Sequence, residues 1–309
     1  MPITLLDGGT GRELLRIGAP FRQPEWSALA LLEAPAFVAR VHAAFIAAGA
    51  EVITTNSYAI VPFHIGADRF ASEGSRLAAL AGRLGREAAD AAKGRVLVAG
   101  SLPPICGSYR ADWFDPRFAR PILATLVEGL RPFVDHWQAE TISCIEEAEL
   151  VREVIGQDAK PLWLAFTLRD DDAARSAEPQ LRSGQRIADA VAAAISLSAQ
   201  AILFNCSQPE VMGAAVSIAR QRIEGFAQSG AATPRIGVYA NAFAAVRKQA
   251  QANTELSEIR SDLTPQGYLA WVNDWIDRGA DIVGGCCGIG PEHIRAIRES
   301  ISARFGIQV

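Results

Sequence analysis

The chain has 309 residues, half of them hydrophobic, with a formal net charge of -4 and a pI near 5.7. This mild acidity gives no electrostatic reason to bind nucleic acid or an anionic membrane surface. The N-terminus does not read as a signal peptide, and no apolar stretch is long enough to span a bilayer. We therefore expect a cytoplasmic protein with no nucleic-acid or membrane partner. No pattern in the sequence sets its oligomeric state.

Short, apolar, β-rich runs alternate with helical stretches rich in Ala, Leu and Arg along the whole chain. Eight strands are expected, at residues 3–6, 51–55, 96–100, 137–142, 161–167, 201–205, 235–239 and 281–284. One helix is expected after each strand, at residues 34–48, 73–92, 117–134, 144–155, 183–198, 209–222, 264–278 and 291–304. The first unit also holds a segment with capping-box spacing, which predicts a short helix capped by Thr10.

Continuous apolar strands separated by helices predict a parallel sheet that is covered on its outer face. Eight such units that close on themselves give a single-domain (β/α)8 TIM barrel over residues 1–309, within the α/β class. An open, doubly wound sheet is the alternative, because alternation does not demonstrate closure. In a barrel, the functional residues follow the strands. Polar, glycine and cysteine residues gather at those positions, namely 7–9, 56–58, 101–104, 140–141, 167, 205–206, 239–241 and 284–287.

The five cysteines are an odd number, and in a reducing compartment they are better read as ligands, nucleophiles or buried thiols than as disulfides. Cys286 and Cys287 follow two glycines, which we expect to relax the backbone so that both sulfurs turn toward one point. Cys206 ends the sixth predicted strand. Three thiolates leave one tetrahedral position open, as in catalytic zinc sites, and all-sulfur ligation favours Zn²⁺ over hard cations.

Other interpretations of these cysteines stay open at this point. They can be ordinary packing residues, since free cysteines are often buried, and the adjacent pair can be a redox pair, although its disulfide would be strained. A closed structural zinc site would need a fourth ligand, and no histidine lies at a predicted strand end. Cys106 and Cys144 follow the third and fourth strands, so that either could approach the mouth of the barrel.

Several separate motifs, in order, resemble the homocysteine S-methyltransferases, a family that includes the betaine and S-methylmethionine enzymes. They lie at residues 7–11, 26–27, 54–58, 140–141, 205–206 and 284–288. The resemblance implies a (β/α)8 barrel with zinc held by Cys206, Cys286 and Cys287, and an amino acid substrate bound by Asp7 and Glu140. The chain departs from the family at residues 239–243, Tyr-Ala-Asn-Ala-Phe, where many members carry Tyr-Pro-Asn followed by Ser-Gly.

The expected reaction transfers a methyl group from a cationic donor to the zinc-bound thiolate of homocysteine, giving methionine. The donor can be S-methylmethionine, S-adenosylmethionine or betaine, and Trp26, Tyr58 and Trp113 are candidates to bind its cation through aromatic faces. Another thiol or selenol acceptor, or a non-catalytic zinc or thiol sensor, are the alternatives.

Composition also suggests lid loops at residues 62–75 and 109–116. The other residues expected to contact substrate are Gly8, Gly9, Thr55, Asn56, Thr141 and Asn205.

Overall fold

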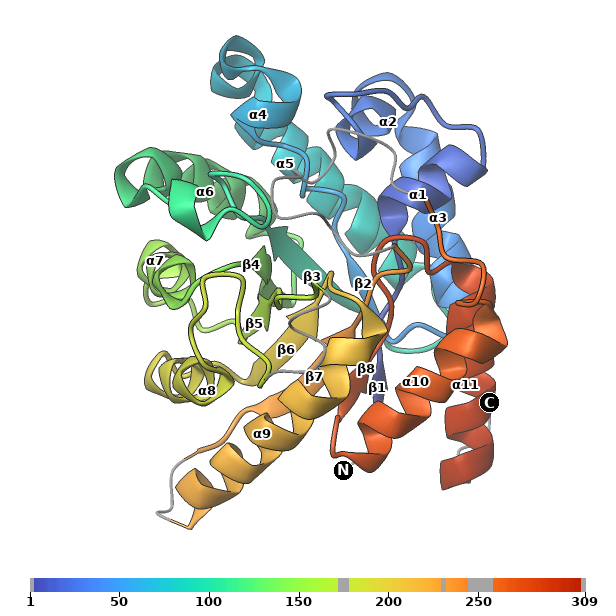
Figure 1. Cartoon of the computed structure of the whole chain (residues 1–309). Helices are drawn as coiled ribbons and strands as arrows, with labels where there is room; N and C mark the ends of the chain where they lie inside the picture. Colours follow the sequence, from blue (N-terminus) through green and yellow to red (C-terminus); the bar gives the residue numbers. More distant parts are fainter. Residues whose placement is uncertain (1–2, 172–177, 229–231, 244–257, 307–309) are drawn as a thin grey trace.

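The computed structural model describes residues 3–171, 178–228, 232–243 and 258–306, and within them all eight predicted strands are confirmed (Figure 1). The strands are β1 (Thr4–Leu5), β2 (Val52–Thr54), β3 (Leu97–Leu102), β4 (His136–Ile142), β5 (Leu162–Phe166), β6 (Ala201–Asn205), β7 (Arg235–Tyr239) and β8 (Ile282–Val283). Each pairs in parallel with its neighbours in the order β1-β8-β7-β6-β5-β4-β3-β2.

The ring of strands closes between β1 and β2. Leu6 and Val52 form a parallel bridge there, and the amide of Asp7 donates to the carbonyl of Val52 at 3.0 Å. Glu51 donates in turn to the carbonyl of Leu5 at 2.7 Å. The (β/α)8 barrel is therefore confirmed, and the open doubly wound sheet is excluded.

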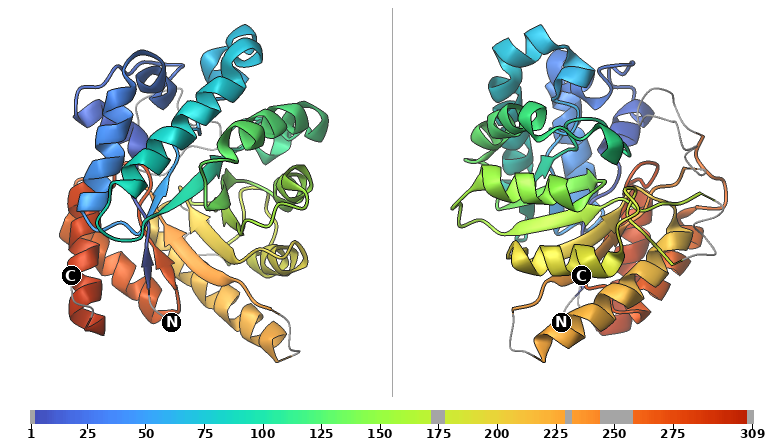
Figure 2. Two further views of the ribbon diagram at one scale, coloured as in Figure 1. Left: turned by 180° about the vertical axis from the view of Figure 1, so that it is seen from behind. Right: turned by 60° about the vertical axis from the view of Figure 1, so that its left-hand side comes forward.

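Helices surround the strands on the outside, as the two further views in Figure 2 show. The first unit carries three of them, α1 (Thr10–Arg16), α2 (Ser27–Glu33) and α3 (Pro35–Ala47). The others are α4 (Pro62–Ile65), α5 (Ala67–Asp90), the 3-10 turn η1 (Ala111–Trp113), α6 (Pro116–Leu130), α7 (Ile145–Ile155), α8 (Ile187–Ser196), α9 (Pro209–Ala227), α10 (Pro265–Asp277) and α11 (Pro291–Phe305). Many begin with proline, whose fixed φ suits the first helical position and whose missing N–H would have no partner there.

Two local predictions are wrong. The capping box at Thr10 does not form, because α1 begins at Thr10 itself, Gly9 is the N-cap, and the Glu13 carboxylate pairs with Arg16 instead. Residues 62–75 are not a lid loop but helix α4 and the start of α5. Their polar composition reflects the solvent-facing side of an amphipathic helix, whose other side is buried at residues such as Phe70.

Side chains from both faces of the strands are buried, so that the barrel has an inner and an outer core. Ala201 and Leu203 of β6 point inward, whereas Ile202 and Phe204 of the same strand pack under the helices. A Cβ atom on Gly237 would lie 2.5 Å from the Leu203 side chain, so the interior is filled at this level. Because the middle of the barrel is packed, any substrate must bind at the carboxyl ends of the strands.

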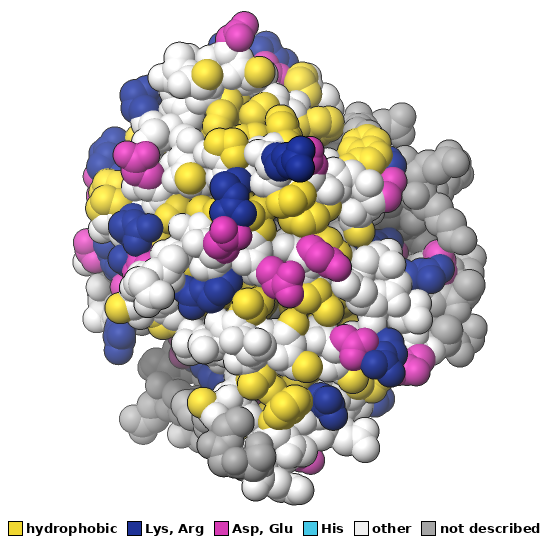
Figure 3. All heavy atoms as spheres, turned by 90° about the vertical axis from the view of Figure 1, so that its left-hand side faces the viewer, with side chains coloured by type: hydrophobic (Ala, Val, Ile, Leu, Met, Phe, Trp, Pro, Cys, Tyr) yellow, Lys and Arg dark blue, Asp and Glu magenta, His cyan; other side chains and the backbone are white. Residues whose placement is uncertain are grey.

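The outer surface mixes both signs of charge. Figure 3 shows acidic and basic side chains interspersed over the face to which α6 and α7 belong, where Arg120 and Glu153 pair at 2.7 Å. In the part of the chain that the structure describes, no helix is both long and apolar enough to cross a membrane.

Candidate active site and metal centre

Three cysteine sulfurs meet at the mouth of the barrel. Cys206 directly follows β6, and Cys286 and Cys287 lie on the loop after β8. Their Sγ atoms all lie within 4.8 Å of one another, and the Sγ atoms of Cys206 and Cys286 are 3.1 Å apart. The predicted meeting of residues 80 positions apart is therefore found in the structure.

Close backbone packing fixes the loops that carry the sulfurs. Cys286 donates its amide to the carbonyl of Ala240 at 2.9 Å, and Cys206 donates to Tyr239 at 3.2 Å, so both cysteine loops are tied to the end of β7. The two glycines before Cys286 act differently from our expectation. Neither has a positive φ, and a Cβ atom would meet Leu6 at 2.5 Å from Gly284 and Ile289 at 2.2 Å from Gly285. These glycines allow close approach of neighbouring chain, whereas the turn of the loop is made by Gly288 with φ 85°.

The cluster fits a zinc ion. Tetrahedral zinc with Zn–S bonds of about 2.3 Å holds its sulfurs about 3.8 Å apart. The three observed sulfurs lie within 4.8 Å of one another, and those of Cys206 and Cys286 are 3.1 Å apart. Hydrogen bonds from the thiols of Cys286 and Cys287 lower the pKa of Cys206, and those same bonds raise the pKa of both donors. The directions of these pKa shifts favour the thiolate at Cys206 over those at Cys286 and Cys287, and a bound cation would favour ionisation of all three sulfurs.

Two acids are buried at the same mouth. Asp7 follows β1 and accepts hydrogen bonds from the amide (2.7 Å) and the hydroxyl (3.1 Å) of Thr54. Glu140 accepts from the hydroxyls of Ser101 and, at 3.4 Å, Tyr239. Burial raises the pKa of Asp7 to about 8 and that of Glu140 to about 7. Burial thus disfavours the charged form of both carboxyls, and a cation beside them would stabilise that form.

Glu140 lies within β4 and not after it, as the sequence had suggested. The pairing of β4 with β5 shifts register between Ala139 and Ile142, and Thr141 has a φ of 61°. The side-chain amide of Asn205 stabilises the backbone at Thr141. Its Oδ1 accepts a hydrogen bond from the Thr141 backbone N–H, and its Nδ2 donates one to the Thr141 hydroxyl, both at 3.0 Å. Both the oxygen and the nitrogen of the Asn205 side chain therefore bond Thr141 within the protein.

The residues predicted after β2 connect this strand end to β3 and to helix α2. The Thr55 hydroxyl accepts from the amide of Ser101 at 3.0 Å, and the Asn56 side chain donates to the carbonyl of Ser27 at 3.1 Å. Gly8 and Gly9 lie where a Cβ atom would meet backbone, at 2.2 Å from the Ile289 carbonyl oxygen and 2.6 Å from that of Cys286. These four positions are therefore required by the packing of the mouth.

The three aromatic candidates do not form one box. Trp26 and Tyr58 meet edge to face with ring centroids 6.3 Å apart, and the Tyr58 hydroxyl bonds Ser108 at 2.5 Å. Trp113 shares a crevice with Tyr58 but is 42% exposed. The guanidinium of Arg110 lies 3.7 Å above its ring, so that one face of Trp113 already holds a cation.

Sequence reasoning missed Tyr109, whose hydroxyl donates to the Cys206 sulfur at 3.1 Å. It lies on the long β3–α6 connection, which was predicted only as a possible lid, and its composition gave no sign of contact with the metal centre. Among the described residues, five non-glycine positions have φ in the left-handed region, and four of them lie at or beside this mouth. They are Trp26, Tyr109, Thr141 and Cys206. Such conformations cost about 1–3 kcal/mol each and gather at functional sites.

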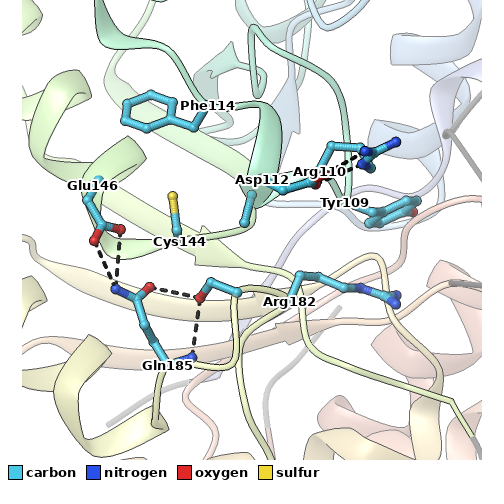
Figure 4. Close-up of a pocket in the computed structure, with 10 residues that line it drawn as sticks. Tyr109, Arg110, Asp112, Phe114, Cys144, Glu146, Arg182 and Gln185 are labelled. Atoms are coloured by element: carbon cyan, nitrogen blue, oxygen red, sulfur yellow. Dashed lines mark hydrogen bonds and ion pairs between the residues drawn. The ribbon is translucent and has the colours of Figure 1, made fainter. Parts of the chain in front are cut away.

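The remaining cysteines lie outside the cluster. Cys106 accepts a hydrogen bond from the amide of Asp115 at 3.4 Å, and Cys144 is the N-cap residue of α7. Cys144 lines a separate cavity of about 780 Å³, which adjoins Tyr109 (Figure 4). Within the described residues, neither sulfur belongs to the group that could hold a metal.

Three convergent sulfurs and two buried acids at the mouth of a (β/α)8 barrel define a barrel enzyme with a metal-binding centre. A family model described as homocysteine S-methyltransferase matches residues 4–301. The chain belongs to the homocysteine S-methyltransferase family and is a methyltransferase.

Individual relatives resemble the chain over its whole length. The homocysteine S-methyltransferase of Escherichia coli (strain K12) is 29% identical over 322 residues, which cover 96% of this chain and 94% of the relative. A selenocysteine methyltransferase of Astragalus bisulcatus is 26% identical over 339 residues, covering 97% and 92%. The crystal structure of the E. coli homocysteine methyltransferase in its metallated form has a TM-score of 0.73 at 26% identity, and the match covers 97% of this chain and 96% of that one.

Proposed function

We propose that this chain is a zinc-dependent homocysteine S-methyltransferase that takes its methyl group from a cationic small-molecule donor and yields methionine. The observation that carries the proposal is the meeting of Cys206, Cys286 and Cys287 within 4.8 Å, beside the buried acids Asp7 and Glu140. The existence of a metallated form of the similar E. coli homocysteine methyltransferase supports a bound metal. A reducing cytosol suits three thiols that must remain free to bind it.

The three cysteines would hold zinc as thiolates and leave one tetrahedral position for the acceptor sulfur. Zinc bound there supplies the ionisation of the substrate thiol, which otherwise has a pKa near 8.5 and is mostly protonated at neutral pH. The acceptor sulfur then forms a bond to the methyl carbon while the bond from that carbon to the donor's positive sulfur or nitrogen breaks. The donor leaves as a neutral sulfide or amine, so the transfer needs no protein base.

Asp7 and Glu140 would bind the ammonium group of the acceptor. Their raised pKa values, about 8 and 7, show that burial makes an unpaired carboxylate unfavourable at this mouth. An incoming ammonium supplies the missing partner, and charge-assisted hydrogen bonds then hold both groups. The Ser101 and Tyr239 hydroxyls on Glu140, and Thr54 on Asp7, orient the two carboxylates before substrate arrives. The main gains in rate are thus positioning and thiolate activation.

The direct test measures metal and product together. Purified protein is assayed for zinc by mass spectrometry and for methionine formation from homocysteine with S-methylmethionine, S-adenosylmethionine and betaine in turn. Cys206→Ala is expected to lose both zinc and activity, and Cys106→Ala, which alters a thiol outside the cluster, is expected to keep both. Full activity in Cys206→Ala without bound zinc would refute the proposal. Tight zinc binding without turnover of any donor would identify a sensor instead.

A selenol acceptor is a second candidate, because the relative from Astragalus bisulcatus is named a selenocysteine methyltransferase. The same assay with selenocysteine in place of homocysteine separates the two acceptors. We expect homocysteine to give the higher kcat/KM. A clear preference for selenocysteine would identify selenocysteine as the acceptor and would leave the proposed metal site unchanged.

A further inference from the structure

A row of polar side chains runs along β4 on the inside of the barrel. His136, Gln138 and Glu140 point inward, whereas Trp137 and Ala139 between them pack in the outer core. His136 is 2% exposed and Gln138 is 0% exposed. The interior of such a barrel is ordinarily filled by branched apolar side chains, and a buried amide costs free energy unless it is hydrogen-bonded. Packing alone therefore gives no reason for a glutamine at this place.

Gln138 is joined to Glu140 through the phenol of Tyr239. Nε2 of Gln138 donates to the Tyr239 hydroxyl at 3.3 Å, and that hydroxyl donates to Oε2 of Glu140 at 3.4 Å. An amide nitrogen can only donate, so the Tyr239 oxygen accepts from Gln138 and directs its single O–H toward the carboxylate. If the amide were turned round, its oxygen would compete with Glu140 for that hydrogen. The orientation of the amide therefore decides whether Tyr239 donates to Glu140.

His136 favours the observed orientation of the Gln138 amide. The His136 ring packs on Trp163, with ring centroids 4.1 Å apart and an angle of 35° between the planes. Burial lowers the His136 pKa to about 4, and smaller effects of Asp135 and of the Gln138 side chain raise it. A neighbour that raises the pKa of an imidazole by hydrogen bonding acts as an acceptor. The amide oxygen of Gln138 therefore lies on the His136 side, which leaves Nε2 for Tyr239.

We propose that Gln138 is a positioning residue for the acceptor's ammonium group, because it directs the Tyr239 hydroxyl toward Glu140 and so prepares that carboxylate for its cationic partner. This inference rests on the proposed methyltransferase function. Ser101 donates to Oε1 of Glu140 and Tyr239 donates to Oε2, so each carboxylate oxygen has a hydroxyl donor. Burial raises the pKa of Glu140 to about 7, and the side chains of Ser101, Gln138 and Tyr239 oppose that rise. Loss of the Gln138 amide would therefore weaken the charged form that an ammonium requires.

The test compares acceptors with and without an ammonium group. Gln138→Met removes the donor and keeps a side chain of similar length. The KM for homocysteine is expected to rise by about 3- to 10-fold, the effect of about one lost hydrogen bond, while kcat changes less than about twofold. For γ-mercaptobutyrate, which is homocysteine without its amino group, the KM should change less than about twofold. The matched control is Leu203→Met, which places the same side chain in the same inner core without removing a hydrogen bond and should leave both KM values unchanged.

A double-mutant cycle tests whether Gln138 acts through Tyr239. In a Tyr239→Phe protein, which lacks the hydroxyl, Gln138→Met should cause no further loss of homocysteine affinity in calorimetry on the zinc-loaded protein. Additive losses in the double variant, or equal losses for both acceptors in Gln138→Met alone, would overturn the inference. Non-additive losses confined to homocysteine, in a protein that transfers no methyl group from any donor, would uphold the inference and refute the proposed function.

Discussion

Gly9 lies where the loop after β1 passes the loop that carries Cys286 and Cys287, and Gly9→Ala is expected to weaken metal binding in a barrel that still folds. A Cβ atom at this position would lie 2.6 Å from the carbonyl oxygen of Cys286 and 2.9 Å from the Cα of Cys287. Both are backbone atoms, so no rotation of a side chain relieves the contact. To reach an ordinary contact of 3.4 Å, the two loops must part by about 0.8 Å.

That displacement is large for a metal centre. Zinc–sulfur distances tolerate deviations of about 0.2 Å, so a shift of about 0.8 Å exceeds the tolerance several times over. Overpacking of this kind costs about 1–3 kcal/mol of folding free energy. Disturbing the groups that position metal ligands typically lowers affinity by about 10- to 100-fold. We therefore expect a folded Gly9→Ala protein whose zinc affinity is reduced by that factor.

The assay is competition for zinc against a chromophoric chelator, with thermal unfolding followed by circular dichroism on the same samples. Gly94→Ala is the control, because a Cβ atom there meets no heavy atom within 4 Å. If Gly9→Ala binds zinc as tightly as Gly94→Ala, the packing of Gly9 does not position the cysteines, and the reasoning fails.

Four further predictions concern the same mouth. Asp7→Asn should raise the KM for homocysteine by about tenfold or more, because a charge-assisted bond to the ammonium is lost, which initial rates at varied homocysteine would measure. In the metal-free protein, burial raises the Asp7 pKa to about 8, so its contribution to stability is full below pH 4 and is lost as pH rises toward 8. In urea unfolding, the free energy of unfolding of Asp7→Asn should therefore increase relative to that of the unaltered protein between pH 5 and pH 8. A difference that stays constant with pH would contradict the assignment. Tyr109→Phe removes a hydrogen bond to the Cys206 sulfur and should weaken zinc binding by about tenfold in the chelator assay. Removal of zinc with a chelator should abolish methionine formation, and added zinc should restore it. Activity that survives complete removal of zinc would contradict the metal mechanism.

The three sulfurs converge although the sequence departs from the family pattern at residues 239–243. Ala240 stands where many members carry proline, yet its carbonyl accepts from the amide of Cys286 at 2.9 Å and from the hydroxyl of Tyr268 at 3.3 Å. Main-chain atoms make the contact between β7 and the cysteine loop, so a change of side chain is tolerated there.

Strand and helix alternation was readable from the sequence because each strand is buried on both faces and each helix on one. Continuous apolar runs such as Ala201–Asn205 and amphipathic stretches such as Pro116–Leu130 follow from local periodicity. The meeting of the three cysteines was also predictable, since all three follow strands whose carboxyl ends share one face of a barrel. The helical nature of residues 62–75 was missed, because polar residues on the exposed side of a helix have the composition of a loop.

Contacts between loops of different units were decided only by the tertiary structure. Tyr109 contacts Cys206 and Arg182 contacts the Tyr109 ring through connections whose paths no local pattern specifies. The exclusion of Cys144 from the sulfur cluster, the raised pKa values of Asp7 and Glu140, and the reason for the glycines before Cys286 likewise depend on what surrounds each side chain. Periodicity along the chain sets which residues lie at the barrel mouth, but burial, charge and hydrogen bonding there are properties of neighbours brought from distant parts of the sequence.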